Sequence, residues 1–154
     1  MDGISNQQVI YLPASGKVAF KRGSLVFSNG GGIVDGIIRI GQGFRGYTHV
    51  GVALGTGKMI AAVALHGVTL QDDFQQLKAL EARPYPGDVE EFISRVQSFI
   101  GDPYDYLALL LAIGIPVGGH GPPKSFTCSS LVAYCMGVQS FRGTAPEQIW
   151  QALK

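Results

Sequence analysis

Hydrophobic residues follow different patterns in the two halves of this chain. Short β-prone runs ended by glycine dominate the first half, and apolar residues at helical spacing dominate the second. Strands joined by short loops pair antiparallel, and helices that follow them cover one face of the sheet. The sequence therefore predicts an α+β fold with a small antiparallel sheet packed against helices.

A β-hairpin is the clearest local prediction. Residues 48–54 and 58–64 are two β-like runs on either side of a loop that contains Gly55 and Gly57. An earlier run at 24–27 predicts a strand that ends at the glycines after Asn29. A further short strand is expected at 67–70.

Helices are expected mainly after residue 88. Asp88 is placed to cap a helix, and Gly137 supplies a C-terminal stop for another. The segment 83–87, with two prolines and a glycine, predicts a break between elements. Helical spacing and capping residues predict helices over 33–40, 72–80, 89–100, 103–113 and 128–136, and a last one that begins at 144–147.

The size and charge of the chain limit its organisation and partners. A chain of 154 residues suits a single domain, 1–154. A net charge of +1 with 15% charged residues gives no electrostatic case for nucleic acid or an anionic membrane. The most apolar stretch, 106–117, falls short of the roughly 20 residues that span a bilayer, so it predicts a buried helix and no transmembrane segment.

The N-terminal residues bear on location. Residues 1–11 lack the charged start and long apolar core of a signal peptide. We therefore expect a cytoplasmic protein, while a phage origin or delivery by a dedicated secretion system stays open. The protein partner and the organism are not indicated by any motif.

Cys128 stands at the start of the predicted helix 128–136. A thiolate is a nucleophile, and the positive end of a helix dipole lowers the pKa of a thiol placed there. A buried cysteine that serves as a small apolar residue is the alternative, but Thr127, Ser129 and Ser130 make the surroundings polar. Cys128 is therefore the candidate nucleophile.

The second cysteine, Cys135, has ordinary core residues around it and is expected to be structural. On one helix it lies about 10 Å from Cys128, too far for a disulfide. Both are expected to be free thiols, which fits a reducing compartment.

His49 begins the first arm of the predicted hairpin and is the candidate base for Cys128. Imidazole accepts a proton near neutral pH, as activation of a thiol requires. The alternative is a histidine that only makes structural hydrogen bonds at a sheet edge. His66 is expected in a turn, and His120 in a solvated loop at 114–124.

No cofactor and no metal are expected. The spacings of the histidines and cysteines do not match the paired ligands of zinc sites. Gly30, Gly31 and Gly32 precede a predicted helix, but the Lys-Ser/Thr of a phosphate-binding loop does not follow. The acidic pairs 72–73 and 90–91 stand at predicted helix starts, where the helix dipole explains them.

Five short motifs, in order, resemble the permuted branch of the NlpC/P60 papain-like superfamily, near the YiiX/YaeF-type amidases and more distantly the lecithin:retinol acyltransferase-like proteins. The motifs are GSLVF (23–27), YTHVGV (47–52), GKMIAA (57–62), GDPYDY (101–106) and FTCSSLV (126–132). The resemblance implies a small antiparallel β-barrel packed against helices. It also implies Cys128 as nucleophile at a helix N-terminus and His49 as base on a barrel strand, in the reversed order of the permuted branch.

The chain departs from this pattern at two positions. Members of the superfamily usually carry a polar residue that orients the histidine at the position of Ala61, and alanine cannot make that hydrogen bond. A carbonyl, a water or a nearby side chain such as His66 can take its place. Ser24 stands where many members have aspartate.

The resemblance implies a cysteine hydrolase that cleaves an amide, with a bacterial cell-wall peptide as the leading substrate class. A peptide or acyl substrate is thus the expected partner. A thiol enzyme that transfers or hydrolyses lipid acyl groups is an alternative, with 106–117 and 114–124 forming an apolar entry. A binding module without catalysis is the other alternative, and Ala61 favours it.

Overall fold

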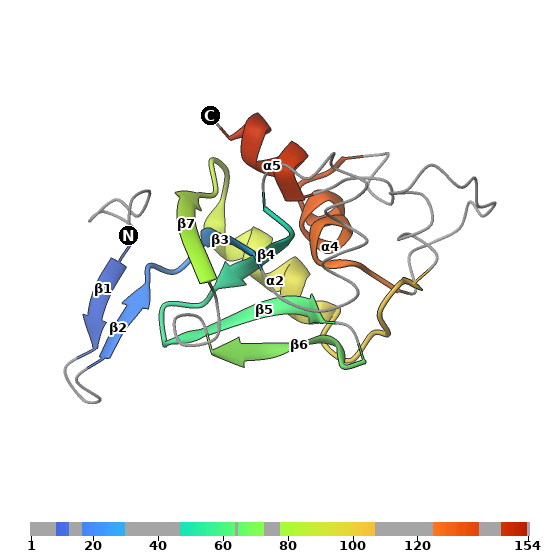
Figure 1. Ribbon diagram of the computed structural model, residues 1–154, viewed down its shortest axis with the longest axis horizontal. Coiled ribbons are helices and arrows are strands. Elements are labelled where there is room, and N and C mark those ends of the chain that lie inside the picture. The colour runs from blue at the N-terminus through green and yellow to red at the C-terminus, as the bar shows by residue number, and fades with distance from the viewer. Residues whose placement is uncertain are drawn as a thin grey trace.

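A computed structural model describes residues 9–12, 17–29, 47–63, 65–72, 78–106, 125–138 and 146–153. Within these residues the fold is α+β, as predicted: a five-stranded antiparallel sheet and three helices, with a separate two-stranded hairpin at one end (Figure 1). The strands are β1 (Val9–Leu12), β2 (Lys17–Phe20), β3 (Ser24–Asn29), β4 (His49–Ala53), β5 (Lys58–Val63), β6 (Gly67–Asp72) and β7 (Lys78–Pro84). The helices are α2 (Val89–Ser98), α4 (Cys128–Cys135) and α5 (Pro146–Ala152).

The five-stranded sheet has the order β6-β5-β4-β3-β7, which leaves β6 and β7 as its edges. It is an open sheet in the described part of the chain, not the closed barrel that the resemblance implies. All of its pairings are antiparallel, and the predicted hairpin is present as β4 and β5. β1 pairs only with β2 among the described strands.

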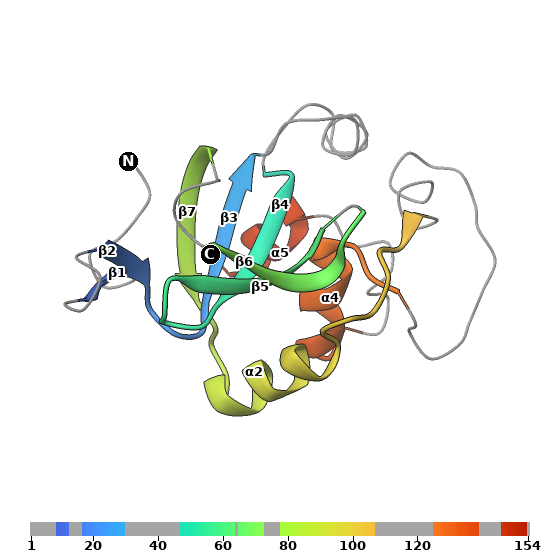
Figure 2. The same cartoon turned by 90° about the horizontal axis from the view of Figure 1, so that it is seen from below.

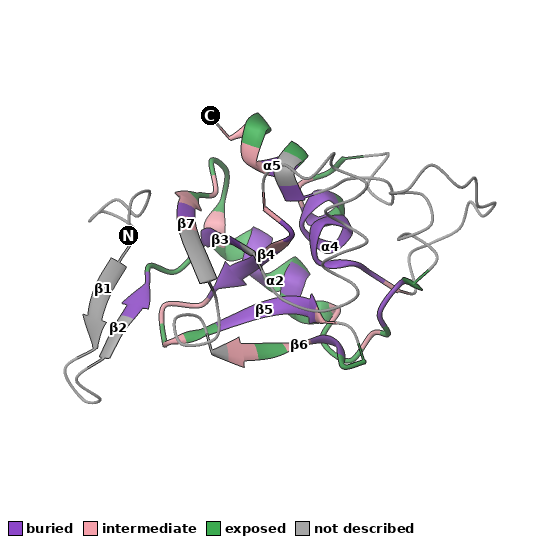
Figure 3. Ribbon diagram, in the orientation of Figure 1, coloured by how far each residue is buried: buried purple, intermediate pink, exposed green. Residues whose placement is uncertain are grey.

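Alternation along the strands divides the core into two clusters, one on each face of the sheet. Leu25 and Phe27 of β3 pack with the three helices, whereas Val26 between them packs on the opposite face with Met59 and Phe20. α4 lies beside β4 on the first face (Figure 2). Buried residues gather on β3, β4, β5 and α4, where the sheet and the helices meet (Figure 3).

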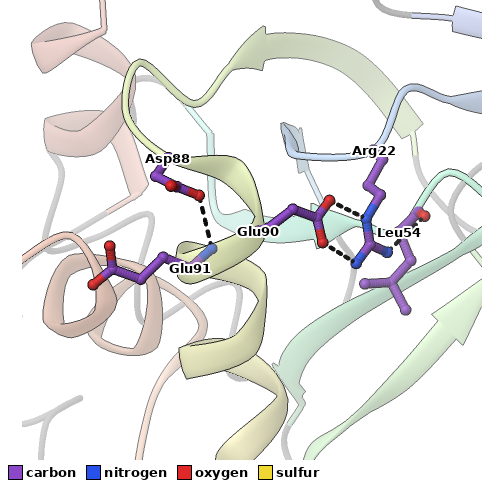
Figure 4. A network of polar contacts seen from close by, with 5 residues as sticks. All are labelled: Arg22, Leu54, Asp88, Glu90 and Glu91. Carbon is purple, nitrogen blue, oxygen red and sulfur yellow. Dashed lines mark hydrogen bonds and ion pairs between the residues drawn. The ribbon is translucent and has the colours of Figure 1, made fainter.

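The start of α2 is fixed by its cap and by an ion pair. Asp88 accepts a hydrogen bond from the Glu91 backbone N–H at 3.0 Å, which confirms the predicted cap. The Arg22 guanidinium donates to both carboxylate oxygens of Glu90 at 2.8 and 2.9 Å, and to the Leu54 carbonyl at 3.3 Å (Figure 4). These contacts join α2 to the turn before β3 and to the residue after β4.

The helix predicted over 72–80 is wrong for the described part of that range. Lys78–Pro84 is strand β7, which pairs with β3, and residue 72 ends β6. The same strand overturns the break predicted at 83–87 for its first two residues, Arg83 and Pro84. Pro84 is tolerated because β7 is an edge strand and its last residue needs no donor on the outer side.

The helix predicted from residue 103 is also wrong at its start. Tyr104 forms an isolated parallel bridge with Phe126, and the flanking bonds run from Asp105 N to Phe126 O and from Phe126 N to Pro103 O, both at 3.0 Å. This bridge lays 103–105 beside the segment that leads into α4. It thereby positions Cys128, two residues after Phe126.

The other described elements agree closely with the predictions. α4 ends before Gly137, whose φ of +86° suits a glycine after a helix. The predicted strand at 67–70 is longer than expected, since β6 continues to residue 72. The helix predicted at 33–40, most of 103–113, the loop 114–124 with His120, and the glycines 30–32 lie outside the described residues.

Candidate active site

Cys128 is the first residue of α4, and a reciprocal cap holds it there. The Thr127 hydroxyl accepts from the Ser130 N–H at 3.2 Å, and the Ser130 hydroxyl accepts from the Thr127 N–H at 2.8 Å. The cap fixes the first turn of the helix. Cys128 therefore sits at the positive end of the helix dipole.

The Cys128 thiol contacts the residue that precedes His49. It donates to the Thr48 carbonyl oxygen with a sulfur–oxygen distance of 3.8 Å, which joins positions 80 residues apart in the sequence. Thr48 is fully buried, and Cys128 is 2% exposed. The structure thus brings the two predicted motifs together at the start of β4.

His49 is the first residue of β4 and is partly exposed. Its Nε2 lies 3.2 Å from Oε1 of Gln71, on edge strand β6. An amide oxygen only accepts hydrogen bonds, so this contact is a hydrogen bond in the tautomer that carries the ring hydrogen on Nε2 and the lone pair on Nδ1.

The two candidate side chains approach the end of β4 from different faces. Val50 and Val52 belong to the core cluster that contains Cys128. His49 alternates with them and shares the other face with Gly51, where a Cβ would meet the Met59 methyl at 2.6 Å. The thiol contact with the Thr48 carbonyl therefore joins Cys128 to the start of the strand and not to the His49 ring.

The position expected for an orienting residue holds only a methyl group. Ala61 pairs with Thr69 and is buried in the apolar cluster with Met59 and Val63. His66 lies exposed in the turn between β5 and β6, where its backbone N–H donates to the Val63 carbonyl at 3.0 Å.

Gln71 is the residue that sequence reasoning missed. The strand at 67–70 was expected to stop one residue short of it, so its side chain was not assigned to a face of the sheet. Extending that strand by one alternation places Gln71 on the face of Met59, its partner in β5. That alternation was the available signal.

Cys135 lies at the other end of α4 and has a different environment. It is buried, and burial raises the pKa of its thiol to about 12 against the opposing effect of the Arg95 charge. The Arg95 guanidinium donates to the Cys135 carbonyl at 3.4 Å. At neutral pH this thiol is protonated, as its predicted structural role requires.

A polar and aromatic cluster adjoins the site through Tyr47. The Tyr47 hydroxyl donates to Glu81 at 2.7 Å, the Arg83 guanidinium donates to the same carboxylate at 2.9 Å, and Arg83 lies 5.0 Å from the ring centre of Trp150. Burial raises the pKa of Glu81, but the bond from Tyr47 and the Arg83 charge outweigh it and hold that pKa below its usual value. The cluster connects edge strand β7, α5 and the residue before Thr48.

Comparisons with other proteins leave the family open. The chain matches no protein-family model, and no curated protein matches it significantly. Among the described residues, no helix has the length and apolar character needed to cross a bilayer.

Proposed function

We propose that this protein is a cysteine hydrolase of the permuted NlpC/P60 papain-like type that cleaves an amide bond. The contact between Cys128 Sγ and the Thr48 carbonyl carries the proposal, because it joins the candidate nucleophile to the strand that begins with the candidate base. The helix dipole at Cys128 and the Gln71 contact at Nε2 of His49 support it further.

The reaction proceeds through an acyl-enzyme. Nδ1 of His49 takes the proton from the Cys128 thiol, and the thiolate attacks the amide carbonyl. Backbone N–H groups at the start of α4 stabilise the oxyanion. The C–N bond breaks as His49 returns the proton to the amine, and a thioester remains on Cys128.

Water then completes the cycle. His49 removes a proton from water, the hydroxide attacks the thioester, and the C–S bond breaks to release a carboxylic acid. The proton returns from His49 to the sulfur. Gln71 keeps the ring in the tautomer that both steps need.

The substrate proposed first is a peptide amide such as those of the bacterial cell wall, which rests on the resemblance of the five motifs. A lipid acyl group is the second substrate class. Incubation with peptidoglycan fragments and with short-chain lipid esters separates them, since only the true class gives release of product that Cys128→Ala abolishes.

A non-catalytic binding module is the second candidate function, and one observation favours it. Cys128 is 2% exposed and its thiol is bonded to a carbonyl, whereas reactive cysteines are usually partly exposed. A thiol-reactive probe with peptide mass mapping decides between the two. If Cys128 is labelled faster than Cys135, and His49→Ala slows the labelling of Cys128, the result supports the hydrolase. If Cys128 is labelled no faster than Cys135 in the wild-type protein, and at the same rate in His49→Ala, the result supports the binding module.

A further inference from the structure

A buried hydroxyl lies beside the candidate base. Ser28, near the end of β3, is fully buried, and its Oγ has no hydrogen-bond partner among the described residues. Burying a hydroxyl without a partner is unfavourable, because the group loses its bonds to water and gains none. Such a group in a core invites a functional explanation.

The candidate partner is His49, and no hydrogen bond joins the two side chains in this structure. Ser28 pairs directly with His49 across β3 and β4, and directly paired residues have their side chains on the same face with Cβ atoms about 4.5–5.5 Å apart. The preceding pair on this face is Val26 with Gly51. The Ser28 hydroxyl and the His49 ring therefore share the face on which Gln71 also lies.

The other neighbour of Ser28 is irregular. Phe27 pairs with Glu81 of β7 and Asn29 with Lys78, so two residues of β7 lie opposite Ser28. A β-bulge of this kind changes the direction of side chains and is frequent beside active sites. The irregularity falls at the one position of β3 that pairs with the candidate base.

We propose that Ser28 is a positioning residue for His49, and that its hydroxyl accepts a hydrogen bond from Nδ1–H of the imidazolium. The imidazolium forms when the Cys128 proton moves to Nδ1, so this inference rests on the proposed function. Gln71 already holds Nε2, and a side chain as short as serine reaches only the ring nitrogen nearest the backbone. Ser28 keeps its own proton throughout.

The test compares Ser28→Ala with Ser24→Ala. Ser24 is also buried, lies on the same strand and face, and is at the end remote from His49. Two measurements are made: the ¹⁵N shift of His49 Nδ1, and the rate at which iodoacetamide alkylates Cys128. Ser28→Ala should move the Nδ1 resonance and slow alkylation about two- to tenfold, the effect of one net hydrogen bond; Ser24→Ala should do neither.

An unchanged Nδ1 resonance in Ser28→Ala overturns the proposal, and so does an equal change in Ser24→Ala. The resonance is recorded without substrate or turnover, at acidic pH, where the imidazolium carries the Nδ1–H that Ser28 is proposed to accept. If Cys128 of the wild-type protein does not react, the proposed hydrolase fails, while the Nδ1 shift still decides whether Ser28 bonds to His49.

Discussion

Helix α4 has a cysteine at each end, and the two cysteines have different surroundings. At the first residue, which follows a cap of polar side chains, Cys128 lies at the positive end of the helix dipole and contacts the Thr48 carbonyl. At the last residue, apolar burial raises the pKa of Cys135 to about 12. One residue type on one helix thus has two environments, which its position along the helix axis sets.

The largest expected effect concerns the pH dependence of Cys135. Only the thiolate form of cysteine reacts, and burial raises the pKa of Cys135 to about 12, so the thiolate fraction is small near neutral pH. The rate of Cys135 alkylation in the folded protein should therefore rise about tenfold per pH unit above pH 7. Peptide mass mapping after iodoacetamide treatment measures it for as long as the fold persists. A rate already at its plateau near pH 8 contradicts the assigned environment.

Removal of the candidate nucleophile, Cys128, is expected to have the next largest effect. Cys128→Ala should lower hydrolysis of a peptide amide about a thousandfold or more, because no acyl-enzyme can form. Cys135→Ala is the matched control and should leave the rate near that of the wild type. Equal losses in both variants would show that stability, not chemistry, limits activity.

His49→Ala should slow alkylation of Cys128 at pH 7 by about a hundredfold, the contribution of a positioned general base. The rate at Cys135 should stay the same in this variant, so the ratio of the two rates in one sample isolates the effect. His66→Ala serves as the control, since that ring is exposed in a turn. If the ratio is unchanged, His49 is not the base.

Gln71→Ala tests the contact at Nε2. Without this hydrogen bond, the His49 ring is no longer held in one tautomer and orientation. We therefore expect kcat to fall about tenfold with little change in KM. Gln97→Ala, an exposed glutamine on α2, is the control. A change in KM alone would assign Gln71 to substrate binding instead.

The smallest effect is expected from the cap. Thr127→Ala should reduce the free energy of unfolding by about 1 kcal/mol, because it removes the acceptor for the Ser130 N–H. Urea denaturation measures it, with Thr56→Ala in the exposed β4–β5 loop as control. Because the cap orders the first turn, alkylation of Cys128 should change while that of Cys135 does not.

Local sequence patterns predicted the elements whose structure depends on neighbouring residues. The glycines between 54 and 58 predicted the hairpin of β4 and β5, and Asp88 and Gly137 predicted helix ends, since turns and caps depend on adjacent residues. Strand β7 was missed because its residues also suit a helix. Pairing with β3, from Asn29 with Lys78 to Ser24 with Pro84, joins residues about 50 to 60 positions apart and overrides that preference.

The candidate site was predicted in part. Cys128 and His49 are residue types that can act as nucleophile and base, and the structure places the thiol beside the residue before His49. The residue types of Gln71 and Ser28 do not indicate a place in the site, because glutamine and serine are common in strands. Their relation to His49 depends on strand order and register, which follow from pairings between distant segments.

The contact between Cys128 and Thr48 can form only late in synthesis, because it joins residues 80 positions apart. The β4–β5 hairpin can pair as soon as residues 49–63 have emerged, but the thiol side of the site is still untranslated at that stage. Domains fold progressively as the chain leaves the ribosome, and contacts of long sequence separation form late. A nascent chain stalled before residue 128 therefore carries His49 without Cys128, and the contact between the thiol and the Thr48 carbonyl forms only when α4 docks.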